Sequence, residues 1–171
     1  MNTFQKAFTL IELLVVIAII GILATLIMTN VQGVRERSRD LKRKANLSSL
    51  QNSLRLYYND AKEFPSSNTS SQIIGCGTTA SPTVCAWGSA FSKNSTSYMS
   101  RLPLDPSSTT TSPIAYQYQR SATNSDQYLI VAKLENLSDA DITTSQANCA
   151  ALYASFSGTK DTTKDYVVCA E

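Results

Sequence analysis

The sequence predicts an α+β protein in which one long N-terminal helix packs on a small antiparallel sheet of about three strands. Two observations support this prediction. No proline occurs before Pro65, so nothing interrupts a helix over the first third of the chain, and alternating apolar and polar residues appear only after residue 113. The 171 residues leave room for one domain and an anchor.

The helix is predicted over residues 8–62, a length of about 80 Å at roughly 1.5 Å per residue. Its first half, residues 8–28, is apolar on all sides and contains a single charged side chain, that of Glu12. Its second half, residues 29–62, is amphipathic. The apolar side chains that recur there every three or four residues are Leu41, Ala45, Leu47, Leu50, Leu54, Tyr57 and Tyr58. Phe64 precedes Pro65, which ends the helix.

Residues 63–171 form the predicted globular head. The segment 66–112 is rich in Ser, Thr, Gly and Pro, which predicts a long surface connection with one short helix between residues 90 and 100. Alternation and β-branched residues predict three strands, and the stretch NCAALYASF predicts a short helix. The strands are expected at Ile114–Arg120, Gln127–Leu134 and Asp165–Cys169.

Charge is distributed unevenly along a chain whose net charge is only +2. Residues 31–62 hold eight basic and three acidic side chains, whereas residues 63–171 hold six basic and nine acidic ones. The basic stretch RERSRDLKRK could bind anionic lipid or nucleic acid, but no aromatic side chains interleave it. We therefore interpret it as a solvated or inter-subunit face and predict no specific nucleic-acid partner.

The chain contains no histidine, which excludes His-dependent catalytic triads and most zinc sites. No phosphate-binding loop, nucleophile–base pair or paired-carboxylate motif is recognisable. We expect no enzyme activity and no cofactor.

Four cysteines, Cys76, Cys85, Cys149 and Cys169, suggest two disulfides if the chain is exported. Four cysteines allow three pairings. Spacing favours Cys76 with Cys85 and Cys149 with Cys169.

Residues 8–28 could span the roughly 30 Å of a bilayer core, and no A-x-A cleavage site follows them. The simplest interpretation is an uncleaved transmembrane anchor. That interpretation leaves Glu12 unexplained, and the basic residues after the apolar run would by themselves place residues 35–171 in the cytoplasm.

A short leader ending in KA, followed by FTLIE and an apolar run, resembles the N-terminal signal of type IV pilins and pseudopilins. The resemblance implies a pilin-like fold and a leader, residues 1–7, that a prepilin peptidase removes on the cytoplasmic side. The cut would fall between Ala7 and Phe8, although the family usually has Gly at the position of Ala7. Phe8 would become a methylated N-terminus, and the head would be extracytoplasmic.

Glu12 would then lie one helical turn after a new amine. A carboxylate there interacts favourably with the helix dipole and with unpaired N–H groups. It could also pair with the Phe8 amine of a neighbouring subunit, which would relieve two buried charges at once. We interpret Glu12 as a subunit-docking residue.

Two later segments resemble major pseudopilins of type II secretion. YYNDAKEFPSS is similar to the end of their long helix, and YMSRLPLDP, with Leu102, Pro103, Asp105 and Pro106, is similar to their LPxDP segment. Those proteins bind calcium in the region where this chain has Glu135, Asp139 and Asp141. These three carboxylates do not form a coordination pattern, so we predict no metal site and keep them as weak calcium candidates.

The sequence thus favours a structural subunit of a type IV pilus-like filament, with the major pseudopilin of a type II secretion system as the alternative. A membrane-tethered binding or adhesive domain is the competitor from another class. The expected partners are further copies of the chain, the prepilin peptidase, an assembly platform and the cytoplasmic membrane. We expect a single-pass protein of that membrane that later becomes part of a cell-surface filament.

Overall fold

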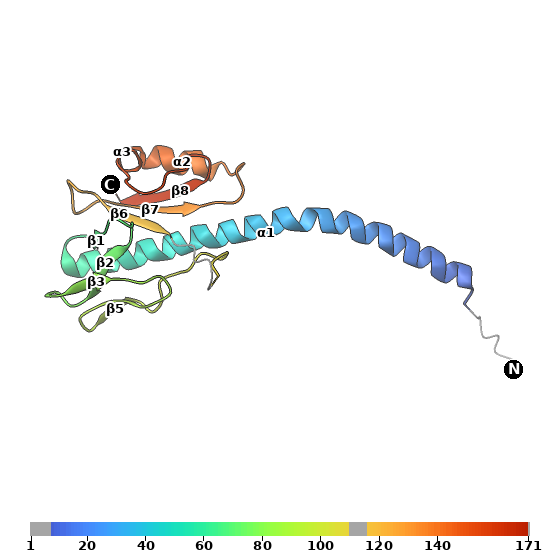
Figure 1. The fold of residues 1–171 in the computed structure, drawn as a ribbon, viewed down its shortest axis with the longest axis horizontal. Coiled ribbons are helices and arrows are strands. Elements are labelled where there is room, and N and C mark those ends of the chain that lie inside the picture. The colour runs from blue at the N-terminus through green and yellow to red at the C-terminus, as the bar shows by residue number, and fades with distance from the viewer. Residues whose placement is uncertain (1–7, 110–115, 171) are drawn as a thin grey trace. The chain divides into compact units, whose positions relative to one another are not determined.

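The computed structural model describes residues 8–109 and 116–170, apart from the side chains of residues 26–30. Its first element is the long helix α1 (Leu10–Ala61), which confirms the main prediction from the sequence (Figure 1). The chain divides into two compact units, residues 1–36 and residues 37–171. Each unit is described here by itself.

The second unit contains two sheets. Sheet A is built from β1 (Ser66–Ser67), β2 (Ile73–Gly77), β3 (Pro82–Val84), β4 (Phe91–Lys93) and β5 (Thr96–Met99), in the order β1-β2-β4-β5 with β3 also paired to β2. Sheet B is antiparallel, in the order β6-β7-β8, and consists of β6 (Gln117–Arg120), β7 (Tyr128–Lys133) and β8 (Asp165–Ala170). Two short helices, α2 (Asp141–Asn148) and α3 (Ala150–Ala154), connect β7 to β8.

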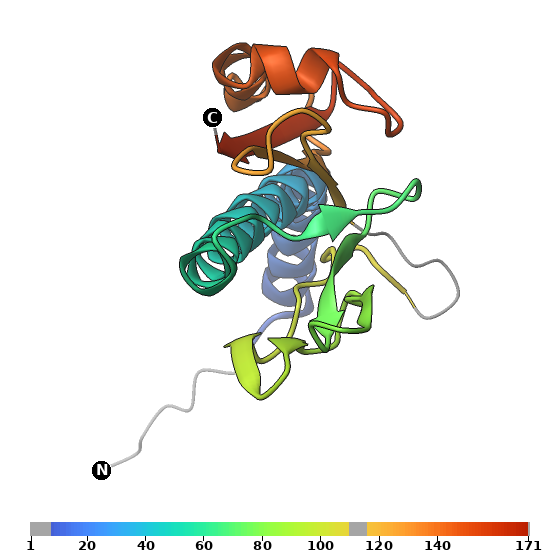
Figure 2. The same ribbon diagram turned by 90° about the vertical axis from the view of Figure 1, so that its left-hand side faces the viewer.

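Within this unit the end of α1 lies between the two sheets, and α2 and α3 cover the far side of sheet B (Figures 1 and 2). Strand β7 is buried on both faces because alternate side chains point to opposite sides. Tyr128 and Ile130 join the cluster around α1, whereas Leu129 and Val131 pack with α3.

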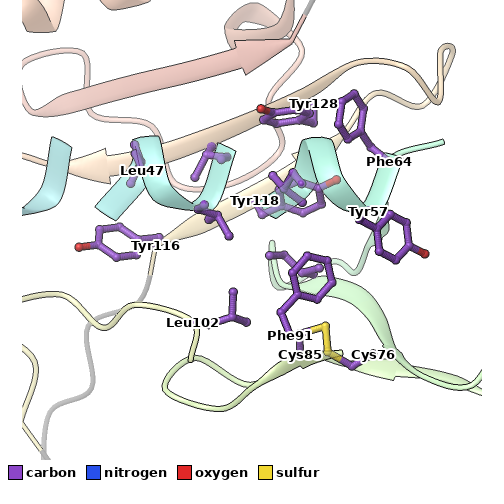
Figure 3. Close-up of a cluster of buried hydrophobic side chains, with 14 of the residues drawn as sticks. Leu47, Tyr57, Phe64, Cys76, Cys85, Phe91, Leu102, Tyr116, Tyr118 and Tyr128 are labelled. Atoms are coloured by element: carbon purple, nitrogen blue, oxygen red, sulfur yellow. A yellow bond between two sulfur atoms is a disulfide. The ribbon is translucent and has the colours of Figure 1, made fainter. Parts of the chain in front are cut away.

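The core around α1 is the larger of the two clusters (Figure 3). Leu47, Leu50, Leu54 and Tyr57 recur at helical spacing and are buried. They pack against side chains from both sheets, which include Ile73, Phe91, Tyr118 and Tyr128.

Helix α1 ends where the sequence predicts. Lys62 adopts a left-handed conformation with φ of 60°, and its N–H donates to the carbonyl of Tyr58 at 2.8 Å. Phe64, which precedes Pro65, donates its N–H to the carbonyl of Ser125 at 3.0 Å. The chain therefore leaves the helix directly towards sheet B.

Two predictions for the head are wrong. Residues 66–99 form sheet A instead of a long surface connection, and the helix expected between residues 90 and 100 is the β4–β5 hairpin. The sheets thus contain more strands than the three expected. These strands have between two and five residues, too few for alternation to stand out in a Ser/Thr-rich segment.

The predictions for the C-terminal part hold better. β7, β8 and α3 confirm three expected elements, whereas α2 was not expected. Of the strand expected at residues 114–120, Gln117–Arg120 is confirmed as β6, and residues 114 and 115 lie outside the described residues.

Candidate functional site

The N-terminal end of α1 carries a reciprocal cap between Thr9 and Glu12. The Glu12 carboxylate accepts hydrogen bonds from the Thr9 N–H at 2.9 Å and from the Thr9 hydroxyl at 2.8 Å. The Glu12 N–H donates in return to the Thr9 Oγ1 at 3.3 Å. This is a capping box, which satisfies N–H groups that the first helical turn leaves unpaired. The pattern Thr-x-x-Glu is visible in the sequence, so Thr9 could have been identified from it.

The cleavage site predicted from the sequence lies at the limit of the described residues. Ala7 is outside them, and Phe8 is 78% exposed. Glu12 lies one turn further along, on the same exposed end of the helix. Its carboxylate thus has a local partner in this single chain, and the predicted contact with a neighbouring amine requires a second copy.

Large apolar side chains are exposed on the first unit. Leu10, Ile11, Ile17, Ile20 and Ile22 each present more than half of their surface to the surroundings. Exposed apolar area of this kind marks a surface that another apolar phase or protein covers. Over the part of the chain that the structure describes, no helix combines the length and the apolar character needed to cross a membrane.

In the second unit, Arg43 lies at the centre of a buried ionic cluster. Its side chain is 3% exposed, and it donates to both carboxylate oxygens of Asp105, at 2.7 and 2.9 Å. It also reaches Asp40 at 2.7 Å, Glu135 at 2.7 Å and the Ser107 hydroxyl at 2.9 Å. The bidentate geometry with Asp105 matches the planar guanidinium. Arg43 therefore connects α1 to the LPLDP segment and to the loop after β7.

Asp40 strengthens the same connection. Its carboxylate accepts the backbone N–H of Glu135 at 3.0 Å and that of Asn136 at 2.8 Å. Asp40 is 2% exposed, so these donors and Arg43 replace the water that burial removes. The contacts fix the loop after β7 against α1.

The charged partners shift the pKa values in this cluster. Hydrogen bonds from Arg39, and further ones from Arg43 and Ser107, lower the pKa of Glu135 to about 2 against the opposing effect of burial. Burial acts to lower the pKa of Arg43, but hydrogen bonds to Asp105, Asp40 and Glu135 outweigh it and raise that pKa. Glu135 and Arg43 therefore remain charged at neutral pH.

The three weak calcium candidates are separated by basic side chains. Glu135 binds Arg39 and Arg43, whereas the Lys44 ammonium lies 2.7 Å from Asp139 and 2.7 Å from Asp141. Among the described residues, no group of three or more side chains of the metal-binding types converges on one point. A cation at Asp139 and Asp141 would have to displace Lys44. That these weak candidates form no metal site stays a prediction.

Both local cysteine pairs are disulfides in the structure. Cys76–Cys85 closes a nine-residue separation across β2 and the end of β3, and Cys149–Cys169 joins the end of α2 to β8. Gly77, directly after Cys76, has a φ of 81°, and a Cβ there would approach the Ser81 carbonyl oxygen to 2.7 Å. A glycine is therefore required for this tight turn.

Comparison with known proteins identifies relatives. Residues 2–28 match the family described as the prokaryotic N-terminal methylation motif. The chain is 34% identical over 102 residues to the type II secretion system core protein G of Escherichia coli K12, which corresponds to 60% of this chain and 66% of that protein. It is 33% identical over 102 residues to the core protein G of Aeromonas hydrophila, covering 60% of this chain and 67% of that protein.

A fimbrial protein of Neisseria meningitidis serogroup A is 40% identical over 73 residues, which is 43% of each chain. No solved structure matches this chain. The similarity to the core G proteins therefore extends well beyond the N-terminal motif, whereas the fimbrial similarity covers less than half of the chain.

Proposed function

Because this chain belongs to the family of type IV pilins and type II secretion pseudopilins, we propose that it is a structural filament subunit that polymerises through its N-terminal helix. The observation that carries the proposal is the N-terminal end of α1. An exposed apolar helix surface there begins with a carboxylate whose partner in a single chain is the neighbouring Thr9. A helix of this kind is suited to burial among copies of itself.

We propose the following sequence of events. The chain is first held in the cytoplasmic membrane by residues 8–28, with the head extracytoplasmic. A prepilin peptidase then cuts between Ala7 and Phe8, and the Phe8 amine is methylated. The assembly platform transfers the mature subunit into a fibre. The matching N-terminal motif supports the processing at Phe8, and the two disulfides, which suit an oxidising compartment, support an extracytoplasmic head.

Glu12 acts in the transfer step. While the subunit is alone, Thr9 hydrogen-bonds the carboxylate and keeps it at the start of the helix. In the fibre, the same carboxylate neutralises the Phe8 amine of a neighbouring copy. Burying the Glu12 carboxylate or the Phe8 amine alone would cost free energy. The incoming subunit therefore favours the axial position at which these two groups meet.

The major pseudopilin of a type II secretion system is the more specific form of this proposal. The similarity to core G proteins covers 60% of the chain and extends into the head. In the head, Asp105 of the LPLDP segment binds Arg43 of α1, so this segment has a structural role in positioning the head on the helix. A pilus subunit is the second candidate, supported by the 40% identity over 73 residues with a fimbrial protein.

A membrane-tethered binding domain is the competing class. Two measurements distinguish a filament subunit from a tethered binding domain. The first is intact-mass analysis of the mature protein, and the second is electron microscopy of sheared fibres with a label on the head. We expect a chain that begins at methylated Phe8 and a fibre that contains it. A mature chain that still begins at Met1, in cells with an active prepilin peptidase, would contradict the proposal.

A further inference from the structure

We propose that α2 forms a cover on the outer edge of β8 that the Cys149–Cys169 disulfide holds in place, and that β8 pairs with β8 of a second copy when this disulfide is absent. This inference concerns the head alone and does not depend on the filament function proposed above. It rests on the backbone contacts of β8, on the position of the disulfide and on the sequence of the strand.

Strand β8 is the last strand of sheet B, so one of its edges has no neighbouring strand among residues 8–109 and 116–170. Val168 lies opposite Ile130 of β7, whereas the N–H of Val167 points away from the sheet and donates to the Ser145 Oγ at 3.2 Å. Backbone groups alternate in direction along a strand. Asp165, Val167 and Cys169 therefore direct their backbone groups to the open edge.

The first half of this edge is satisfied locally. The Asp165 N–H donates to the Asp161 carbonyl at 2.8 Å, and its carbonyl accepts from the Gln146 side-chain amide at 2.7 Å. Together with Ser145, these contacts occupy the positions that an additional strand would use. In the part of the chain that the structure describes, the outward N–H of Cys169 has no hydrogen-bond partner.

The disulfide is the covalent link between the cover and the strand. Ser145 and Gln146 belong to α2, which ends next to Cys149, and the bond to Cys169 fixes this end beside the outer half of β8. Leu152, Tyr153 and Phe156 provide apolar packing on the side of sheet B away from α1. These side chains lie beyond Cys149 and secure α3, whereas α2 is held by the buried Ile142 and by the bonds of Ser145 and Gln146 to β8.

An uncovered β8 would fit a second copy of itself. Its sequence DYVVCA combines β-branched and aromatic residues with one charged residue at its start, and contains no proline or glycine. Two identical edges can pair antiparallel about a two-fold axis, so the same surface serves both partners. Unprotected edges of this type are established sites of unwanted association.

Loss of the disulfide has a defined chemistry. An external dithiol donates two electrons and two protons to the S–S bond, which leaves Cys149 and Cys169 as thiols and the reductant as a disulfide. Serine at both positions reproduces the uncrosslinked state without a reductant.

The first experiment measures hydrogen exchange in the full-length protein in detergent. In the double variant C149S/C169S we expect exchange at the Val167 amide to rise roughly 100-fold, as the entropy of a loop of this size suggests. The Val168 amide, bonded to β7, should change much less. C76S/C85S is the matched control, because it removes the other disulfide. In this variant the ratio of the exchange rates of the Val167 and Val168 amides should be the same as in the parent protein. Unchanged protection of Val167 in C149S/C169S would overturn the inference.

The second experiment compares C149S/C169S with C149S/C169P. Both lack the disulfide, but proline at 169 also removes the outward N–H and blocks pairing at an edge position. We expect sedimentation and chemical cross-linking to show dimers for the serine variant and a return to the parent's behaviour for the proline variant. Equal association of both variants, or of neither, would refute pairing through β8.

Discussion

Arg43 and Asp105 lie 62 residues apart in the sequence and form a bidentate ion pair in which both side chains are 3% exposed. The pair joins α1 to the LPLDP segment, and Asp40 and Glu135 extend it to the loop after β7. Three parts of the chain that are distant in sequence are thus held at one point. Removing Arg43, the only cation that binds Asp105 in the described residues, would leave that carboxylate buried without an ionic partner.

Arg43→Ala should lower the free energy of unfolding of the head by about 3–5 kcal/mol, because Asp105 and Asp40 would remain buried without the guanidinium that binds them. Denaturant unfolding of the full-length protein in detergent, followed by circular dichroism, measures this change. Arg37→Ala is the control, since Arg37 is an exposed residue of the same basic stretch and its loss should cost less than about 0.5 kcal/mol. Similar effects of the two substitutions would show that the cluster contributes no more than a surface charge.

The pH dependence of stability should reflect Glu135. Its pKa is lowered from 4.5 to about 2 in the folded protein, so the folded state binds its proton less readily than the unfolded state does. The stabilisation is therefore fully present above about pH 4.5 and is lost as the pH falls towards 2. Glu135→Gln should flatten this part of the curve, and unfolding measured at several pH values between 2 and 6 tests it. A parent and a variant with parallel curves would contradict the assignment.

Calcium should have little effect on this protein, because the Lys44 ammonium already lies between Asp139 and Asp141. When calcium is added, or removed with a chelator, we expect the melting temperature to change by less than about 1 °C. For a domain of this size, that corresponds to a change of about a quarter of a kcal/mol in the free energy of unfolding. Lys44→Met is the informative variant, since it leaves the two carboxylates without their cation and should lower the melting temperature. A parent protein that loses stability in chelator would show that the carboxylates bind a metal in spite of Lys44.

Glu12→Val should abolish fibre formation while membrane insertion, cleavage and head folding continue. Insertion should even improve, because a charged side chain is removed from the apolar segment. Assembly should fail, since the incoming Phe8 amine would be buried unpaired at a cost of several kcal/mol per subunit. Glu12→Asp should be partly defective, because the shorter side chain keeps the charge but loses reach.

Thr9→Val is the matched control for this prediction. It removes the hydroxyl of the capping box and keeps the Glu12 charge, so it should reduce fibre yield less than Glu12→Val does. The measurement is the ratio of sheared fibre to membrane-bound mature subunit. Abundant fibre from Glu12→Val would refute the docking role and leave the carboxylate as a helix cap.

Local signals in the sequence were sufficient for several elements. Helical periodicity predicted the buried face of α1 with Leu47, Leu50 and Leu54, but it wrongly included Leu41 and Ala45, which are exposed. The Phe64–Pro65 step predicted the end of the helix. The strands β7 and β8 are long enough for β-branched residues to identify them. In each case the cause acts within a few residues, through backbone sterics or through side chains one turn apart. The N-terminal motif is local in the same sense.

Only the tertiary structure showed the features that depend on residues distant in sequence, namely the burial of Arg43 and the pairing of strands in sheet A. Within RERSRDLKRK the sequence does not distinguish Arg43 from Arg37, yet one is buried and the other exposed. The difference arises because the carboxylates of Asp105 and Glu135, far along the chain, are placed beside Arg43 by the packing of both sheets on α1. Sheet A likewise depends on pairing between strands of two to five residues, and a strand that short is stabilised only by the neighbours that the fold supplies.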